Sequence, residues 1–151
     1  MQRVTFRLHA DAVAALSALR NRLAVRVLPV PDDEPAVTVA AAATIPCAAR
    51  AVLHAELRVL ALPALWLATL GTVAGRSDEL VLAAVVDAEL LAVHAAVHDA
   101  LAGRVTNQVA AYLPGLWLPH CVLATGRPAD AFALLHPVEP VRAQVVGVDV
   151  S

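Results

Sequence analysis

The segments PAVTVA at residues 35–40 and PHCVLA at residues 119–124 share one pattern: proline, three variable residues, an aliphatic residue and alanine. Both have the aliphatic and β-branched composition of strands that pack on a buried face. Each is followed shortly by a proline that favours the start of a helix, Pro46 in the first case and Pro128 in the second. The repeated order of strand and helix predicts a fold made of two similar halves.

The rest of the chain contains strand and helix patterns in irregular order. Alternating or continuous apolar residues predict strands, at residues 4–8, 25–30, 36–43, 65–73, 79–86, 116–124 and 141–150. Apolar residues three and four apart predict helices, at residues 11–23, 48–60, 88–101 and 128–135. The strands and helices do not alternate as they do in a parallel sheet. We therefore predict a single α+β domain over residues 1–151 with mainly antiparallel pairing.

Local signals add detail to these elements. Asp11 and Asp87 each precede an apolar helical pattern and are predicted to cap the helix that follows. In the first of these helices, Arg20 and Arg22 fall opposite the apolar face, so we expect both side chains to point toward solvent. Residues 75–78, GRSD, are expected to form the turn of a hairpin, and residues 104–115 are expected to form a loop.

The composition argues against a membrane protein and against a partner with many phosphates. The chain is 60% hydrophobic, but its longest uncharged apolar stretch, residues 59–75, is interrupted by Pro63, Gly71 and Gly75. Eleven basic residues, all arginine, and a net charge of -2 lack the positive surface that duplex nucleic acid requires. The first eight residues lack the apolar core of a signal peptide, so a cytoplasmic protein is expected.

Three segments resemble the 2H phosphoesterase superfamily, in its branch of 2′-5′ RNA ligase-like cyclic phosphodiesterases: residues 119–124, the preceding PGLWLP at 114–119, and ELLAVHAAVH at 89–98. In that family, each half of the protein carries a strand motif of the form His-x-Thr or His-x-Ser. The resemblance implies a bilobed α+β fold whose antiparallel sheets line a central cleft and whose helices lie outside. It also implies a small cyclic phosphate, nucleotide or RNA end as the ligand, and no cofactor.

Strand geometry explains why the family motif has this spacing. Residues i and i+2 of a strand point to the same side, so a histidine and a hydroxyl residue at that spacing enter one cleft. Two imidazoles can then exchange protons with the attacking water and the leaving oxygen, because the pKa of histidine lies near working pH. The two hydroxyl groups hydrogen-bond the phosphoryl oxygens.

The chain departs from the family motif at two positions. Ala36 stands where the first histidine belongs, and Val122 stands where the second hydroxyl belongs. The candidate site residues are therefore His120 as the acid or base, Thr38 as a donor to the phosphate, and Arg127 as a counter-charge. Loss of one acid–base group costs about 10² to 10⁴ in rate, so an impaired site is expected. The alternative is a non-catalytic interaction or dimerisation module with an apolar partner surface.

The remaining histidines and the cysteines suggest no second site. His94 and His98 lie four residues apart on one helix, but two ligands are too few for zinc, and no metal is predicted. Cys121 should point away from His120, because neighbouring strand residues face opposite sides. Both cysteines, Cys121 and Cys47, are expected to be free and buried.

Two further segments each allow two interpretations. His9 follows the first strand and can enter the cleft if the fold places it there. The acidic residues 32–34 form either a solvated loop or a lid beside the strand that contains Ala36.

Overall fold

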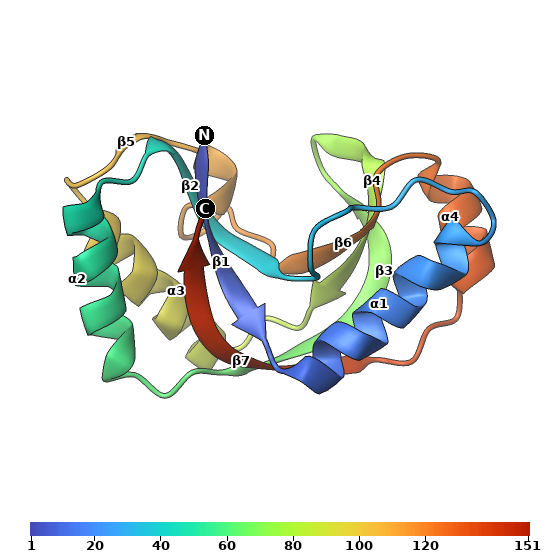
Figure 1. The fold of residues 1–151 in the computed structure, drawn as a ribbon, viewed down its shortest axis with the longest axis horizontal. Coiled ribbons are helices and arrows are strands. Elements are labelled where there is room, and N and C mark those ends of the chain that lie inside the picture. The colour runs from blue at the N-terminus through green and yellow to red at the C-terminus, as the bar shows by residue number, and fades with distance from the viewer.

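The computed structural model describes residues 1–151 and contains both helices and strands (Figure 1). The chain order of its elements is β1 (Gln2–Leu8), α1 (Ala10–Ala24), β2 (Val37–Thr44), α2 (Cys47–Arg58), β3 (Ala64–Val73), β4 (Arg76–Ala84), α3 (Ala88–Leu101), β5 (Thr106–Gln108), the 3₁₀ helix η1 (Ala110–Tyr112), β6 (His120–Ala124), α4 (Pro128–Leu135) and β7 (Val141–Val150).

The strands form one seven-stranded sheet in the order β5-β2-β1-β7-β3-β4-β6. Every neighbouring pair is antiparallel, which confirms the predicted α+β class with antiparallel pairing. The long strand β7 pairs with two neighbours: residues 141–144 pair with β3, and residues 145–150 pair with β1. Although β2 and β6 are five places apart in this order, they contact each other, so the sheet is strongly curved.

The helices lie in two pairs at either end of the sheet (Figure 1). Helices α2 and α3 pack on each other, and α3 also contacts β2. Helices α1 and α4 pack on each other, with α1 against β6 and β7 and α4 against β3 and β4. One connected hydrophobic core joins the two ends, from Phe6 in β1 and Leu53 in α2 to Leu123 in β6.

Several local predictions are confirmed. In β1 the residues Val4, Phe6 and Leu8 are buried, as the alternating pattern predicts. Helix α3 begins after Asp87, whose carboxylate accepts a hydrogen bond of 2.8 Å from the Leu90 amide. The predicted hairpin is formed by β3 and β4, and the predicted helix 128–135 is α4.

Other predictions were wrong. Residues 25–30 form turns and irregular structure rather than a strand, because Val27 adopts a left-handed conformation with φ 60° and is 85% exposed. The N-cap of α1 is His9, whose ring accepts a hydrogen bond from the Asp11 amide, so Asp11 lies in the first turn. The predicted loop 104–115 contains β5 and η1, and β5 extends the sheet by pairing with β2.

No helix combines the length and the apolar character that crossing a membrane requires. The apolar stretch 59–75, considered above as a possible span, instead contains the whole of strand β3.

Candidate functional site

A cavity of about 240 Å³ lies where β1, β2, β4 and β6 come close together. Both repeated segments contribute to its wall: Ala36 and Thr38 from the first, and His120 and Val122 from the second. The two pairs of i, i+2 positions that the sequence singled out therefore meet in one site. The curvature of the sheet brings them together, since β2 and β6 are not neighbours in it.

His120 is half-buried in the first position of β6. Its Nδ1 lies 2.7 Å from the carbonyl oxygen of Leu118, which is an acceptor, so Nδ1 carries the hydrogen and donates it. The pKa of His120 is lowered mainly by burial, while the Leu118 carbonyl and the charge of Glu79 oppose that shift. The neutral ring that results has its Nε2 lone pair available to a ligand or to a proton.

Thr38 occupies an alternating position in β2, between the buried residues Val37 and Val39. Its side chain is half-buried and lines the cavity. Its backbone carbonyl accepts a hydrogen bond of 2.9 Å from the indole Nε1 of Trp117. That bond holds the first repeated segment against the approach to the second.

The prediction that Arg20 points toward solvent was wrong. Arg20 is only 7% exposed and lines the cavity. Its Nε and Nη2 donate to the carbonyl of Val122 at 3.1 and 2.8 Å, and its Nη1 donates to the carbonyl of Asp33 at 2.6 Å. The packing of α1 against β6 encloses this side of the helix, and the two carbonyls satisfy the buried guanidinium. Arg22, by contrast, is exposed as predicted.

Arg127, predicted as the counter-charge, does not line the cavity. Its guanidinium forms an exposed ion pair of 3.0 Å with Asp130 in the first turn of α4. Besides Arg20, the arginines that line the cavity are Arg3 and Arg76. Arg3 was detectable, because it shares the outward side of β1 with Thr5, whereas Arg76 lies in a hairpin whose position depends on tertiary structure.

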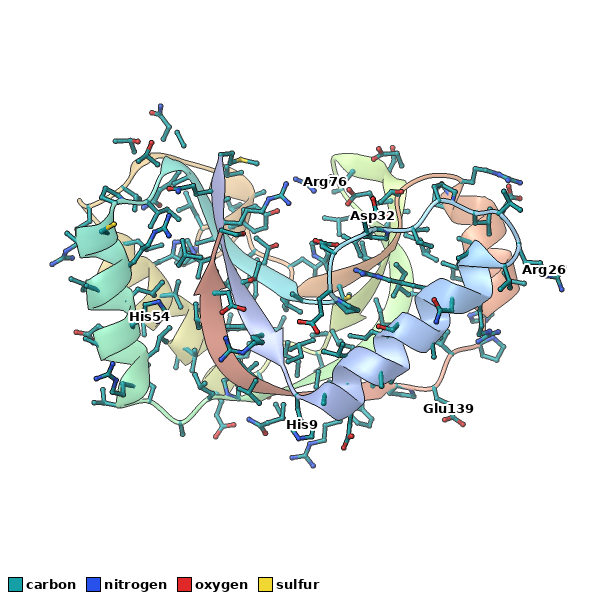
Figure 2. The ribbon with its side chains drawn as sticks, viewed as in Figure 1. His9, Arg26, Asp32, His54, Arg76 and Glu139 are labelled. Carbon is teal, nitrogen blue, oxygen red and sulfur yellow. The ribbon has the colours of Figure 1, made fainter.

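Three carboxylates also line the cavity. Asp33 and Glu34 come from the acidic loop, which is exposed and forms part of the wall, and Glu79 comes from β4. Figure 2 shows Arg76 and the loop residue Asp32 at the same edge of the molecule, opposite His9 and Glu139. With three arginines and three carboxylates, the lining has no net formal charge apart from the chain terminus and His120. Such a site suits a small ligand with mixed polarity better than a long polyanion.

Glu79 differs from the other two carboxylates in its environment. Its Oε2 atom is buried and has no hydrogen-bond partner. The nearest cation, Nη1 of Arg76, lies 3.6 Å away, which is beyond hydrogen-bond distance. Sequence reasoning placed Glu79 only at the start of a strand, and no local signal marked it as part of the site.

His94 and His98 belong to the core beside β2. The Nε2 of His94 lies 2.8 Å from the Tyr112 carbonyl, and its ring stacks on Trp117 at a centroid distance of 4.0 Å. His98 Nε2 lies 3.0 Å from the carbonyl of Val39. Burial, and then the neighbouring His98, lower the pKa of His94 to about 4. No three His, Cys, Asp or Glu side chains lie together in a way that could hold a metal ion.

The other candidates lie outside the chemistry of the cavity. His9 caps α1 and does not line it. Cys121 is fully buried on the other side of β6 from His120, and burial raises the pKa of its thiol to about 11. Cys47 is exposed at the first position of α2, so the prediction that both cysteines are buried was wrong for this one.

The site therefore combines one histidine, one threonine, three arginines and an unpartnered carboxylate oxygen around a small cavity. A search of protein-family models and of curated proteins found no match to the chain.

Proposed function

We propose that this cavity binds a small phosphate-bearing ligand, namely a cyclic phosphate, a nucleotide or an RNA end, as a diverged relative of the 2′-5′ RNA ligase-like 2H phosphoesterases. One observation carries the proposal. His120 and Thr38, which come from the two repeated segments, line the same cavity, and Arg3 lines it too. Arg3 takes part in none of the ion pairs of the chain and is free to pair with an anion.

The arrangement of the elements supports the two-half organisation that this proposal includes. Strand β7 pairs with β1 through one part of its length and with β3 through the other. Each repeated segment leads into a helix that begins at a proline: α2 follows Pro46, and α4 starts at Pro128. We propose that β7 joins the two halves and that the cavity is the cleft between them.

The chemistry available at the site is mainly that of binding. Phosphoryl oxygens accept hydrogen bonds from hydroxyl and guanidinium donors, which Thr38 and Arg3 provide. In hydrolysis of a cyclic phosphodiester, Nε2 of His120 would take a proton from water while the water oxygen bonds to phosphorus and one ester P–O bond breaks. The leaving oxygen then needs a proton, and Ala36 has none to give. We therefore propose slow turnover, about 10² to 10⁴ below that of a site with two such groups.

The open cavity favours ligand binding over the alternative of a purely structural interaction module. In such a module we expect side chains to fill the space between the repeated segments, because only a binding site needs an open concavity. The space here is about 240 Å³ and is lined mainly by polar and charged residues. This volume suits a phosphate ester that is only partly enclosed.

Calorimetric titration of the full chain with adenosine 2′,3′-cyclic monophosphate tests the proposal. We expect binding by the wild-type protein and about 2- to 10-fold weaker binding by Thr38→Val, which keeps the side-chain shape but removes the hydrogen-bond donor. His54→Ala, on the exposed side of α2, is the control and should bind as the wild type does.

Chromatography of the same mixtures over a day measures turnover. Slow opening of the cyclic phosphate that disappears in His120→Ala would support an impaired enzyme, and binding without turnover would indicate a ligand-binding protein. If the wild-type protein binds neither cyclic nucleotides, nucleoside monophosphates nor inorganic phosphate at millimolar concentration, the proposed function is wrong.

A further inference from the structure

A row of exposed apolar side chains crosses three adjacent segments of the sheet. Trp66 in β3 lies opposite Val85, whose amide donates a hydrogen bond of 2.8 Å to the Trp66 carbonyl. The Ala84 amide donates in turn to the carbonyl of Pro119, which places Leu118 beside Val85. Directly opposed residues of antiparallel segments share a face. Trp66, Val85 and Leu118 therefore form one continuous row, and they are 47%, 54% and 38% exposed.

Nothing in the chain covers this row. The neighbours of Trp66 in β3, Leu65 and Leu67, point to the other side of the strand and are buried in the core. Leu116, two residues before Leu118, adds a further exposed apolar side chain. A contiguous exposed apolar patch marks a surface where another molecule docks, and tryptophan is enriched at the centre of such interfaces.

Charged side chains of opposite sign flank Trp66 on its two sides. On one side is β7, where Arg142 lies opposite Trp66. On the other side is β4, and the chain that leaves β4 carries Asp87 and Glu89 at the start of α3. Trp66 and these three charged residues line one hollow of about 370 Å³. Arg142 and Glu89 are exposed, and neither forms an ion pair within the chain, so both charges are available to another molecule.

We infer that this face is a two-fold dimer interface, in which the row of Trp66, Val85 and Leu118 packs against the same row of a second copy of the chain. In a two-fold interface one patch faces itself, so each side of the patch meets the opposite side of the other copy. An axis through Trp66 brings Arg142 of one copy toward Glu89 of the other, and the pairing occurs twice. The face is therefore complementary to itself in charge.

A second copy fits this face better than the other possible occupants. Nucleic acid or an anionic membrane would be repelled by Asp87 and Glu89. A small ligand can stack on Trp66 but leaves Leu116 and Leu118 exposed. An interface that buries about 800 Å² from each partner has an apolar centre and a polar rim, which is the composition of the row and its flanking charges.

The dimer interface is separate from the proposed binding site. None of the residues of the row or of the flanking charges lines the cavity between the repeated segments. Ligand binding in that cavity and dimerisation at this face are therefore tested independently of each other.

Sedimentation equilibrium of the full chain, from micromolar to millimolar concentration, tests the inference. The wild-type protein should shift from the mass of one chain to the mass of two. Trp66→Ser should weaken dimerisation about 30-fold or more, since an interface tryptophan commonly has that effect when it is truncated. Val25→Ser removes an equally exposed apolar side chain at the end of α1 and is the control, which should dimerise as the wild type does.

An exchange of the two charges separates pairing from general damage to the protein. Arg142→Glu and Glu89→Arg should each weaken dimerisation about 10-fold or more, because each places like charges opposite one another twice. The double variant restores opposite charges in reversed order and should dimerise within about 3-fold of the wild type.

Three results would overturn the inference. The first is a wild-type protein that stays monomeric at millimolar concentration, which would leave the face to a different partner. The second is a dimer that Trp66→Ser does not weaken. The third is a charge-exchanged double variant that is folded by circular dichroism but dimerises no better than the single variants.

Discussion

Replacing His94 with phenylalanine should flatten the dependence of protein stability on acid pH. The side chain of His94 is 1% exposed, its Nε2 contacts the carbonyls of Val39 and Tyr112, and its ring stacks on Trp117. Burial lowers the pKa of His94 from 6.5 to about 4, with a further contribution from His98. The folded protein therefore binds this proton less readily than the unfolded chain does.

The sign and the size of the effect follow from that difference in pKa. The stabilisation associated with neutral His94 is complete above pH 6.5, the pKa of the unfolded chain, and is lost as the pH falls toward 4. At about 1.4 kcal/mol for each unit of pKa, the shift corresponds to about 3 kcal/mol of unfolding free energy across this window. Phenylalanine keeps the stacked ring but has no proton to bind.

Urea denaturation followed by tryptophan fluorescence, at intervals from pH 7.5 to pH 4, measures this effect. At neutral pH we expect His94→Phe to be about 1 to 3 kcal/mol less stable, because the Tyr112 carbonyl loses its buried donor and the Val39 carbonyl keeps only His98. That deficit should shrink or reverse by about 3 kcal/mol at pH 4, since carboxylate contributions are common to both proteins and cancel. The exposed control His54→Phe should run parallel to the wild type. Parallel curves for wild type and His94→Phe would refute the reasoning.

Three further outcomes are expected at the cavity. Arg20→Met should lower the unfolding free energy by about 2 to 3 kcal/mol in urea denaturation, because two backbone carbonyls lose their buried donors; a change below 0.5 kcal/mol would contradict this. Ala36→His should raise the rate of adenosine 2′,3′-cyclic monophosphate opening by about 10² or more, measured by chromatography, with no increase when His120→Ala is also present. Arg3→Ala should weaken nucleotide binding about 10-fold or more in calorimetry, whereas Arg127→Ala should leave it unchanged, because Arg3 lines the cavity and Arg127 does not.

The elements that were predicted correctly are those whose signals are local. Strand β1 follows from alternating burial, and helix α3 follows from its Asp87 cap. The strand predicted at residues 25–30 failed because its apolar residues suggested a strand, although the backbone there turns through Val27 before two prolines. A turn of that kind depends on the direction that the chain must take after α1 ends, which local patterns do not specify.

The candidate site was only partly accessible to sequence reasoning. Period-two spacing was sufficient to place Ala36 with Thr38, and His120 with Val122, on common sides of their strands. It could not identify Arg20, because the helical pattern shows only that this residue lies off the apolar face, and burial there depends on the packing of α1 against β6. Arg127 was chosen for its nearness in sequence to the second repeated segment, but its charge pairs with Asp130.

The sequence by itself determined the antiparallel α+β character, most helix and strand positions, and the identity of the two segments that carry His120 and Thr38. These properties depend on side-chain periodicity, on caps and on prolines, all of which act within a few residues. The tertiary structure alone decided that the two segments face one cavity, that Arg20 and Arg76 line it, and that Glu79 Oε2 is buried without a hydrogen-bond partner. Those properties depend on sheet curvature and on strand pairing between distant residues, which no local pattern encodes.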